Sequence, residues 1–380
     1  MSTSPTSTPP QPADQVVIAK GTGPWLWLFV RNSTLLRHVV IALVGAVALV
    51  SLSTGISAFR DFELAFVAAY AVAVAGLTVL IGLSGQISIG NGAFMAVGGY
   101  VGALIFIHLQ WPLAAIIVVS TLAAAAFGAL FGIAAARLRG PYLAGATLML
   151  AVALPDLATK YASLGGDQGL GFFITTPAFL GANFSPQRWQ AWLNCGCALI
   201  ALVLLANLVR SRVGRSWRAI RDDEVAAALS GLNVARLQIL AFVVSAACAG
   251  LGGVLLAAVQ GTVSPVLFSL GLSIQLLTAA VLGGLGTLAG AIWGAALLYI
   301  APLYLTNLFT SHNIASQTTS QFIPIIGYGV VLILVMLIFP RGIQGGLIRL
   351  IGQPGEPAGN LMTSWRRQSP VAVRKEKGRT

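Results

Sequence analysis

The chain has 380 residues, of which 57% are apolar and only 8% are charged, with a formal net charge of +12. A soluble protein carries about 25% charged residues, so this composition excludes an ordinary soluble fold and indicates a polytopic helical membrane protein. A transmembrane barrel is a poor fit, because its strands would alternate apolar and polar residues, whereas the apolar runs here are continuous.

The positive charge does not indicate nucleic-acid binding. Nineteen of the 22 basic residues fall in four stretches: before the first apolar run, at Arg137 and Arg139, from Arg210 to Arg236, and from Arg341 onward. Such clustering is typical of the positive-inside bias of membrane proteins. We therefore expect these four stretches on the cytoplasmic side, with both termini in the cytoplasm.

Three regions divide the chain. Residues 1–38 are expected to be a disordered cytoplasmic segment ending in an interfacial anchor, 39–346 the transmembrane domain, and 347–380 a polar, basic cytoplasmic tail. The transmembrane domain contains about ten apolar runs that predict transmembrane or membrane-embedded helices, each of about 20 residues. They are Val39–Phe59, Phe62–Leu83, Ile89–Leu109, Leu113–Leu138, Tyr142–Tyr161, Trp192–Val209, Leu237–Gln260, Leu272–Gly283, Leu288–Leu308 and Phe322–Phe339.

The eighth run, Leu272–Gly283, is too short to cross a bilayer unless Ser264–Gly271 extends it, so it predicts a broken or re-entrant element. Glycines at four-residue spacing indicate close helix packing. The candidates are Gly98/Gly102, Gly128/Gly132 and Gly286/Gly290/Gly294.

The sequence offers no catalytic, cofactor-binding or metal-binding constellation. Its three histidines are far apart, its three cysteines lie in apolar runs, and it contains no phosphate-binding loop motif. The stretch Gly166–Gly169 is expected to have no flanking strand and carries no nucleotide-binding signal. We therefore expect a non-enzymatic protein without a cofactor.

Polar and flexible residues join the second and third apolar runs, from Gly82 to Phe94. Non-helical backbone at membrane depth occurs only where protein buries it or water lines it. The side chains of Ser84, Gln86, Ser88 and Asn91 are therefore candidates for a path that a polar solute follows. A hydrated cytoplasmic turn between two helices is the alternative.

The longest cytoplasmic loop, 210–236, contains the segment Arg221-Asp222-Asp223-Glu224, followed by alanines and Gly231. Acidic residues suit a helix N-terminus, alanine propagates a helix, and glycine often ends one. The pattern predicts a short helix outside the membrane, suited to docking into a groove of a partner. A solvated loop whose arginines only set the topology is the alternative.

These segments resemble one family. Gly82–Phe94 is similar to the G-x-x-G-Q-x-S-x-G-x-x-A-F signature of LivM-type permease subunits of branched-chain amino acid ABC importers. The resemblance covers roughly Leu64 to Leu347. Its further matches are Leu138–Ala144 with Thr147-Leu148, Gly165–Leu170, Ala219–Glu224 with Ala226, Ala227 and Gly231, Val281–Gly290, and Phe339–Ile343.

The resemblance implies one transmembrane subunit of a bacterial inner-membrane importer for branched-chain or related small amino acids. Its implied partners are a second homologous permease, two cytoplasmic ATPase subunits and a periplasmic binding protein. It implies that Arg221, Asp222, Asp223, Glu224, Ala226, Ala227 and Gly231 couple this subunit to an ATPase. A stand-alone secondary transporter or channel is the competing hypothesis, but it would need ionisable residues at membrane depth, which are almost absent here.

Overall fold

The computed structural model describes residues 58–138, 141–174, 176–177, 185–311, 323–339 and 342–350. Eight helices in these ranges are long and apolar enough to cross a membrane. The prediction of an all-α polytopic membrane protein is thus confirmed. Segment 1–38, most of the first predicted run (Val39–Phe59) and the tail beyond residue 350 lie outside the described residues.

The helices follow the predicted apolar runs closely. The long ones are α3 (Ala58–Ser84), α4 (Asn91–Leu109), α5 (Leu113–Ala135), α6 (Pro141–Lys160), α7 (Pro186–Arg210), α10 (Val234–Gln260) and α12 (Leu288–Ser311). The last predicted run forms α13 (Ile323–Ile338), which the shorter α14 (Gly342–Leu350) follows.

The eighth run is a broken element, as its length suggested. The 3-10 turn η4 (Pro265–Phe268) precedes the 14-residue helix α11 (Leu270–Gly283). Together they make a 19-residue stretch, Pro265–Gly283, that is long enough to span. The residues before the apolar run therefore supply the missing length.

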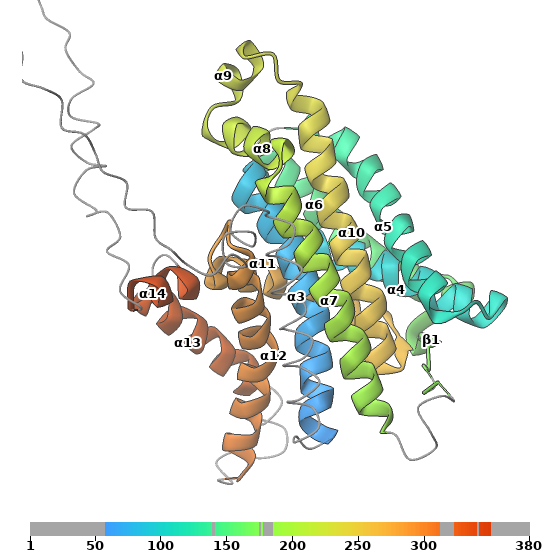
Figure 1. Cartoon of the computed structure of the whole chain (residues 1–380). Helices are drawn as coiled ribbons and strands as arrows, with labels where there is room; N and C mark the ends of the chain where they lie inside the picture. The colour runs from blue at the N-terminus through green and yellow to red at the C-terminus, as the bar shows by residue number, and fades with distance from the viewer. Residues whose placement is uncertain are drawn as a thin grey trace, which may run out of the picture.

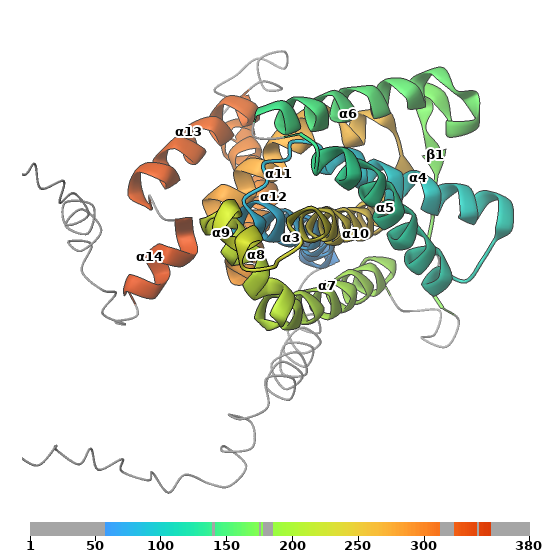
Figure 2. The same ribbon diagram turned by 90° about the horizontal axis from the view of Figure 1, so that it is seen from above.

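Helices α3 and α10 form the centre of the bundle, and the other helices surround them when the molecule is seen from above (Figure 2). Helix α10 packs against α3, α4 and α5, while α3 also packs against α7 and α12. In the most apolar 18-residue stretch of each helix, 83% of α3 and 67% of α10 is buried inside the protein. Helices α13 and α14 lie to one side (Figure 1).

Glycines on α10 let its neighbours approach at backbone distance. A Cβ added to Gly252 would lie 2.7 Å from the carbonyl oxygen of Ala69 in α3. A Cβ on Gly253 would overlap the backbone of Met95 in α4, and one on Gly250 would overlap Ala124 in α5. The predicted packing role of Gly98 holds too, because it faces the backbone of Gly250.

Two short strands lie at the end of the bundle opposite α8 and α9 (Figure 1). Strand β1 (Leu170–Gly171) pairs antiparallel with β2 (Thr262–Val263). The expectation that no strand flanks Gly166–Gly169 was wrong, since β1 begins at the next residue. A two-residue strand has no alternating pattern for a sequence to reveal, and its partner lies about ninety positions away.

Polar side chains join α3, α7 and α10 near this end. The carboxylate of Asp61 is fully buried, and the Arg188 Nε atom lies 3.4 Å from Asp61 Oδ2. Six residues further along α7, the buried amide of Asn194 donates to the carbonyl oxygens of Ala65 (3.0 Å) and Leu255 (3.4 Å). These contacts tie the three helices together.

Candidate functional site

The segment that joins α3 to α4 is non-helical and lies inside the protein. The side chains of Ser84, Gln86, Ser88 and Asn91 are 4%, 7%, 0% and 1% exposed, whereas the intervening Ile87 is 50% exposed. This burial argues against a hydrated turn as the environment of these polar side chains. It also means that other parts of this chain surround these side chains in this conformation.

Hydrogen bonds hold this segment to helices that are distant in sequence. Gln86 Nε2 donates to Ser84 Oγ (3.2 Å) and to the carbonyl oxygen of Gln238 in α10 (3.3 Å). The amide of Ile89 donates to Thr147 Oγ1 in α6 (3.0 Å). The segment therefore contacts both the central helix and the outer helix α6.

The first turn of α4 is held between α10 and α11. The Gly92 amide donates to Ser273 Oγ (3.1 Å), and Ser245 Oγ donates to Asn91 Oδ1 (3.4 Å). Among the described residues, the buried Asn91 Nδ2 has no hydrogen-bond partner. This polar cluster at the helix start would have to open for Ser88 or Asn91 to contact a solute.

The loop 210–236 contains two helices, α8 (Arg212–Asp222) and α9 (Glu224–Leu229). Helix α8 is amphipathic, and its buried face consists of Gly214, Trp217 and Ile220. The Trp217 ring is fully buried, and its Nε1 atom donates to the carbonyl oxygen of Leu237 (2.8 Å). Helix α8 is therefore anchored on the start of α10.

Arg221 extends this anchor to the end of α3. Its guanidinium donates to the carbonyl oxygen of Gly82, and its side chain lies against Gly85, where φ is +74°. A Cβ on Gly85 would lie 3.2 Å from Arg221 Cγ. The signature segment and the predicted coupling segment, about 140 positions apart in sequence, are thus in direct contact.

The predicted helix after the acidic residues is confirmed as α9. Asp223 caps it, since its Oδ1 accepts from the amides of Val225 (2.9 Å) and Ala226 (3.0 Å). The chain turns at Gly231, where φ is +84°. Only Ala227 of this helix is buried, while Val225 and Leu229 are 69% and 85% exposed. Figure 1 shows α9 standing out at one end of the bundle.

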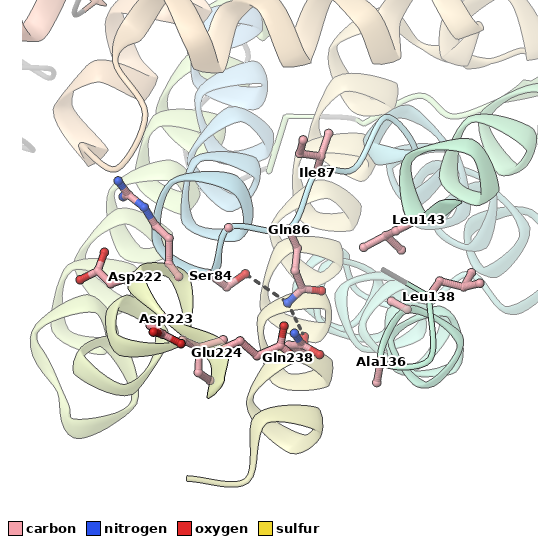
Figure 3. A pocket seen from close by; sticks show the side chains of 14 residues that line it. Ser84, Gln86, Ile87, Ala136, Leu138, Leu143, Asp222, Asp223, Glu224 and Gln238 are labelled. Carbon is pink, nitrogen blue, oxygen red and sulfur yellow. Dashed lines mark hydrogen bonds between the residues drawn. The ribbon is translucent and has the colours of Figure 1, made fainter. Parts of the chain in front are cut away.

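A cavity of about 290 Å³ lies between α9 and the buried polar segment (Figure 3). Residues from four regions line it: Ser84–Ile87, the end of α5 with the start of α6, Ile220–Glu224, and Gln238 of α10. Gln86 points into it between Ser84 and Gln238, and Glu224 lies on the facing wall (Figure 3). The turn after α5, which carries Arg137, therefore lies at the same end of the bundle as the basic loop.

The structure brings together some of the predicted residues and separates others. Ser84 and Gln86 share the cavity with Arg221, Asp222, Asp223 and Glu224. Asn91 lies in the α4–α10–α11 cluster, while Ser88 is buried and its Oγ accepts from the Gly90 amide (3.3 Å). Ala226 is exposed on α9. The sequence analysis missed Trp217 and Gln238. Trp217 could have been found, because a tryptophan among regularly spaced arginines indicates an amphipathic helix. The described part contains no group of three residues able to hold a metal ion.

Comparisons with known proteins point to one kind of relative. The profile of the family described as "Branched-chain amino acid transport system / permease component" matches residues 59–340. The high-affinity branched-chain amino acid transport system permease protein LivM of Escherichia coli (strain K12) is 34% identical over 256 residues, which cover 61% of this chain and 60% of LivM. The permease protein LivH of Salmonella typhimurium is 30% identical over 294 residues, covering 73% of this chain and 91% of LivH.

A third relative, the high-affinity branched-chain amino acid transport system permease protein BraD of Pseudomonas aeruginosa, is 35% identical over 147 residues, which cover 39% of this chain and 44% of BraD. The chain spans 60% of the length of LivM. No solved structure matches it significantly. The match to the family profile extends over both the buried polar segment and the α8–α9 loop.

Proposed function

The chain belongs to the family of permease components of branched-chain amino acid transport systems, and from this premise we propose its role in an ABC importer. It forms one transmembrane subunit, in the inner membrane of a bacterium, of an importer for branched-chain or related small amino acids. A second homologous permease supplies the other side of the path. A periplasmic binding protein delivers the solute, and two cytoplasmic ATPase subunits hydrolyse ATP.

The observation that carries the proposal is the contrast between α8 and α9. Helix α8 is fixed to the bundle by the buried Trp217, whereas α9 presents Val225 and Leu229 to the outside. Exposed apolar side chains beside a firmly held helix are typical of a surface that a partner covers. We assign α9 as the part that docks into an ATPase subunit, with Asp223 and Gly231 setting its two ends.

The contacts behind α9 supply a route for motion into the membrane. Arg221 bonds to the backbone of Gly82, and Gly82 is in backbone contact with Gly286 between α11 and α12. A shift of α8 caused by ATPase closure would therefore move the end of α3 and the α11–α12 turn together. Asp222 and Glu224 line the cavity beside this route and supply polar contacts that change when it moves.

We place Ser84 and Gln86 at the cytoplasmic end of the solute path, because both line the cavity behind α9. Ser88 and Asn91 contribute only after the start of α4 separates from its neighbours, since both are buried and Asn91 accepts a hydrogen bond from Ser245 of α10. The path is thus closed beyond this cavity, at the level of Ser88 and Asn91, in this conformation.

The test is purification of the tagged chain from its native membrane in mild detergent, with identification of the proteins that accompany it. We expect a second permease and an ATPase carrying a phosphate-binding loop. Recovery of a stable chain by itself that transports a solute down an ion gradient without ATP would contradict the proposal.

A further inference from the structure

A second cavity, of about 370 Å³, lies at the end of α10 that is farthest from α9. Five polar side chains from different elements line it: Tyr70 of α3, Gln260 at the end of α10, Ser264 and Ser269 on either side of η4, and Gln275 of α11. None of the described lining residues is charged. Neutral donors and acceptors gathered from four elements are typical of a site that binds a small polar molecule reversibly.

The position of Gln275 argues that this cavity does not open onto lipid. Gln275 lies in the second turn of α11, within an apolar candidate span, and it is exposed in the isolated chain. An amide facing hydrocarbon without a partner costs several kcal/mol. The exposed side of the first two turns of α11 therefore faces either a neighbouring subunit or a water-filled passage.

The broken geometry of this region adds a preference for a negative group. Helix α11 starts at Leu270 after the 3-10 turn, and Ser269 at its N-cap makes no side-chain cap bond to the first turn. The N-terminus of a helix carries a partial positive charge and favours a carboxylate. Ser269 and Gly271 both line the cavity, so the start of α11 lies at its wall.

Apolar side chains line the same cavity. Val266, Leu267 and Leu272 line the cavity next to the polar side chains, and Leu272 is buried. A ligand that complements both kinds of lining residue carries a carboxylate and an aliphatic side chain. An α-amino acid with an aliphatic side chain has both features, whereas urea has neither.

We infer that this cavity is one half of a solute-contact site on the path, and that it binds the carboxylate and aliphatic side chain of an amino acid. The inference rests on the proposed function, because a second permease has to complete the site across the exposed side of α11. It adds a location distinct from the buried Ser84–Asn91 segment, at the opposite end of the bundle.

The first test is uptake of radiolabelled L-leucine by cells that carry the whole importer. We expect Gln275→Leu and Ser269→Ala each to raise the KM for uptake about tenfold, the effect of one hydrogen bond to a charged group. The double variant Ile274→Gln/Gln275→Leu keeps one amide but moves it by one position, and it should not restore the KM. Restoration by this variant, or a KM within twofold of wild type in both single variants, would overturn the inference.

The second test does not depend on transport rates. Gln275→Cys is placed in this chain after its own three cysteines, all free, are replaced by alanine, and labelling of this chain is followed in the whole importer. L-leucine should slow the reaction of this cysteine with N-ethylmaleimide, and urea should not. An unchanged rate in an importer that takes up leucine would refute the site but leave the proposed function intact. A wild-type importer that transports none of a panel of amino acids would refute the proposed function itself.

Discussion

Gly82 and Gly286 meet backbone to backbone, at the point where α3 ends and the turn between α11 and α12 begins. A Cβ added to Gly82 would lie 2.7 Å from Gly286 Cα and would overlap its amide nitrogen. The carbonyl oxygen of Gly82 accepts the hydrogen bond from Arg221. One residue thus contacts both the membrane turn and the cytoplasmic helix α8.

This close contact predicts that a single methyl group added at Gly82 destabilises the fold. Gly82→Ala should lower the free energy of unfolding by about 1–3 kcal/mol, because backbone atoms cannot move aside as a flexible side chain does. Thermal unfolding in detergent measures the change. Gly196→Ala is the matched control, since no atom lies within 4 Å of a Cβ at this position of α7. Equal melting temperatures for the two variants would contradict the close approach.

The exposed tip of α9 predicts a loss of ATPase binding. Leu229 is 85% exposed, so Leu229→Asp should leave the fold intact but place a charge in an apolar contact with the ATPase. We expect binding to weaken about tenfold or more. The recovery of ATPase with the tagged chain measures it, and Leu229→Met is the control. Ala227 is a less informative position for a charge, because it is buried in this chain.

Arg221 predicts a different defect, one of coupling without loss of docking. Arg221→Gln removes the charged donor to Gly82, a hydrogen bond that contributes about 1.5–3 kcal/mol. The ATPase should still co-purify, while the number of solutes imported per ATP falls. Transport and hydrolysis measured together in proteoliposomes give this ratio. Arg212→Gln, at the exposed start of α8, should keep the wild-type ratio.

The ion pair between Asp61 and Arg188 lies at the end of the bundle opposite α8 and α9. Its loss should lower the stability of the fold and leave the number of solutes imported per ATP unchanged. Asp61 is fully buried and pairs with Arg188, so Asp61→Asn leaves a guanidinium without its charged partner. We expect a loss of about 1–3 kcal/mol in the free energy of unfolding. A double-mutant cycle with Arg188→Gln should give a coupling energy clearly different from zero. Additive effects of the two changes would show that the pair contributes little.

Local sequence signals were sufficient for the helices and for α9. The apolar runs mark the spans, and Asp223 and Gly231 mark the two ends of α9 through backbone preferences that neighbouring residues determine. The burial of Gln86, Ser88 and Asn91 could not be predicted in this way. It depends on Gln238, Ser245 and Ser273, which lie more than 150 positions away in sequence. Helix α8 was missed because its arginines at three-residue spacing also fit a solvated loop; they are Arg212, Arg215, Arg218 and Arg221.

The glycines of α10 also decide what kind of motion the bundle favours. Helices whose side chains interdigitate have to repack when one moves, and this restricts them to rotation about hinges. Along α10, Gly250, Gly252 and Gly253 place backbone against α5, α3 and α4, so these contacts have few side chains that interlock. The expected motion is therefore shear, in which neighbouring helices slide along α10 by small steps and keep their contacts. An alanine at any of these glycines would disturb the packing and would also hinder the sliding of the neighbouring helix along α10.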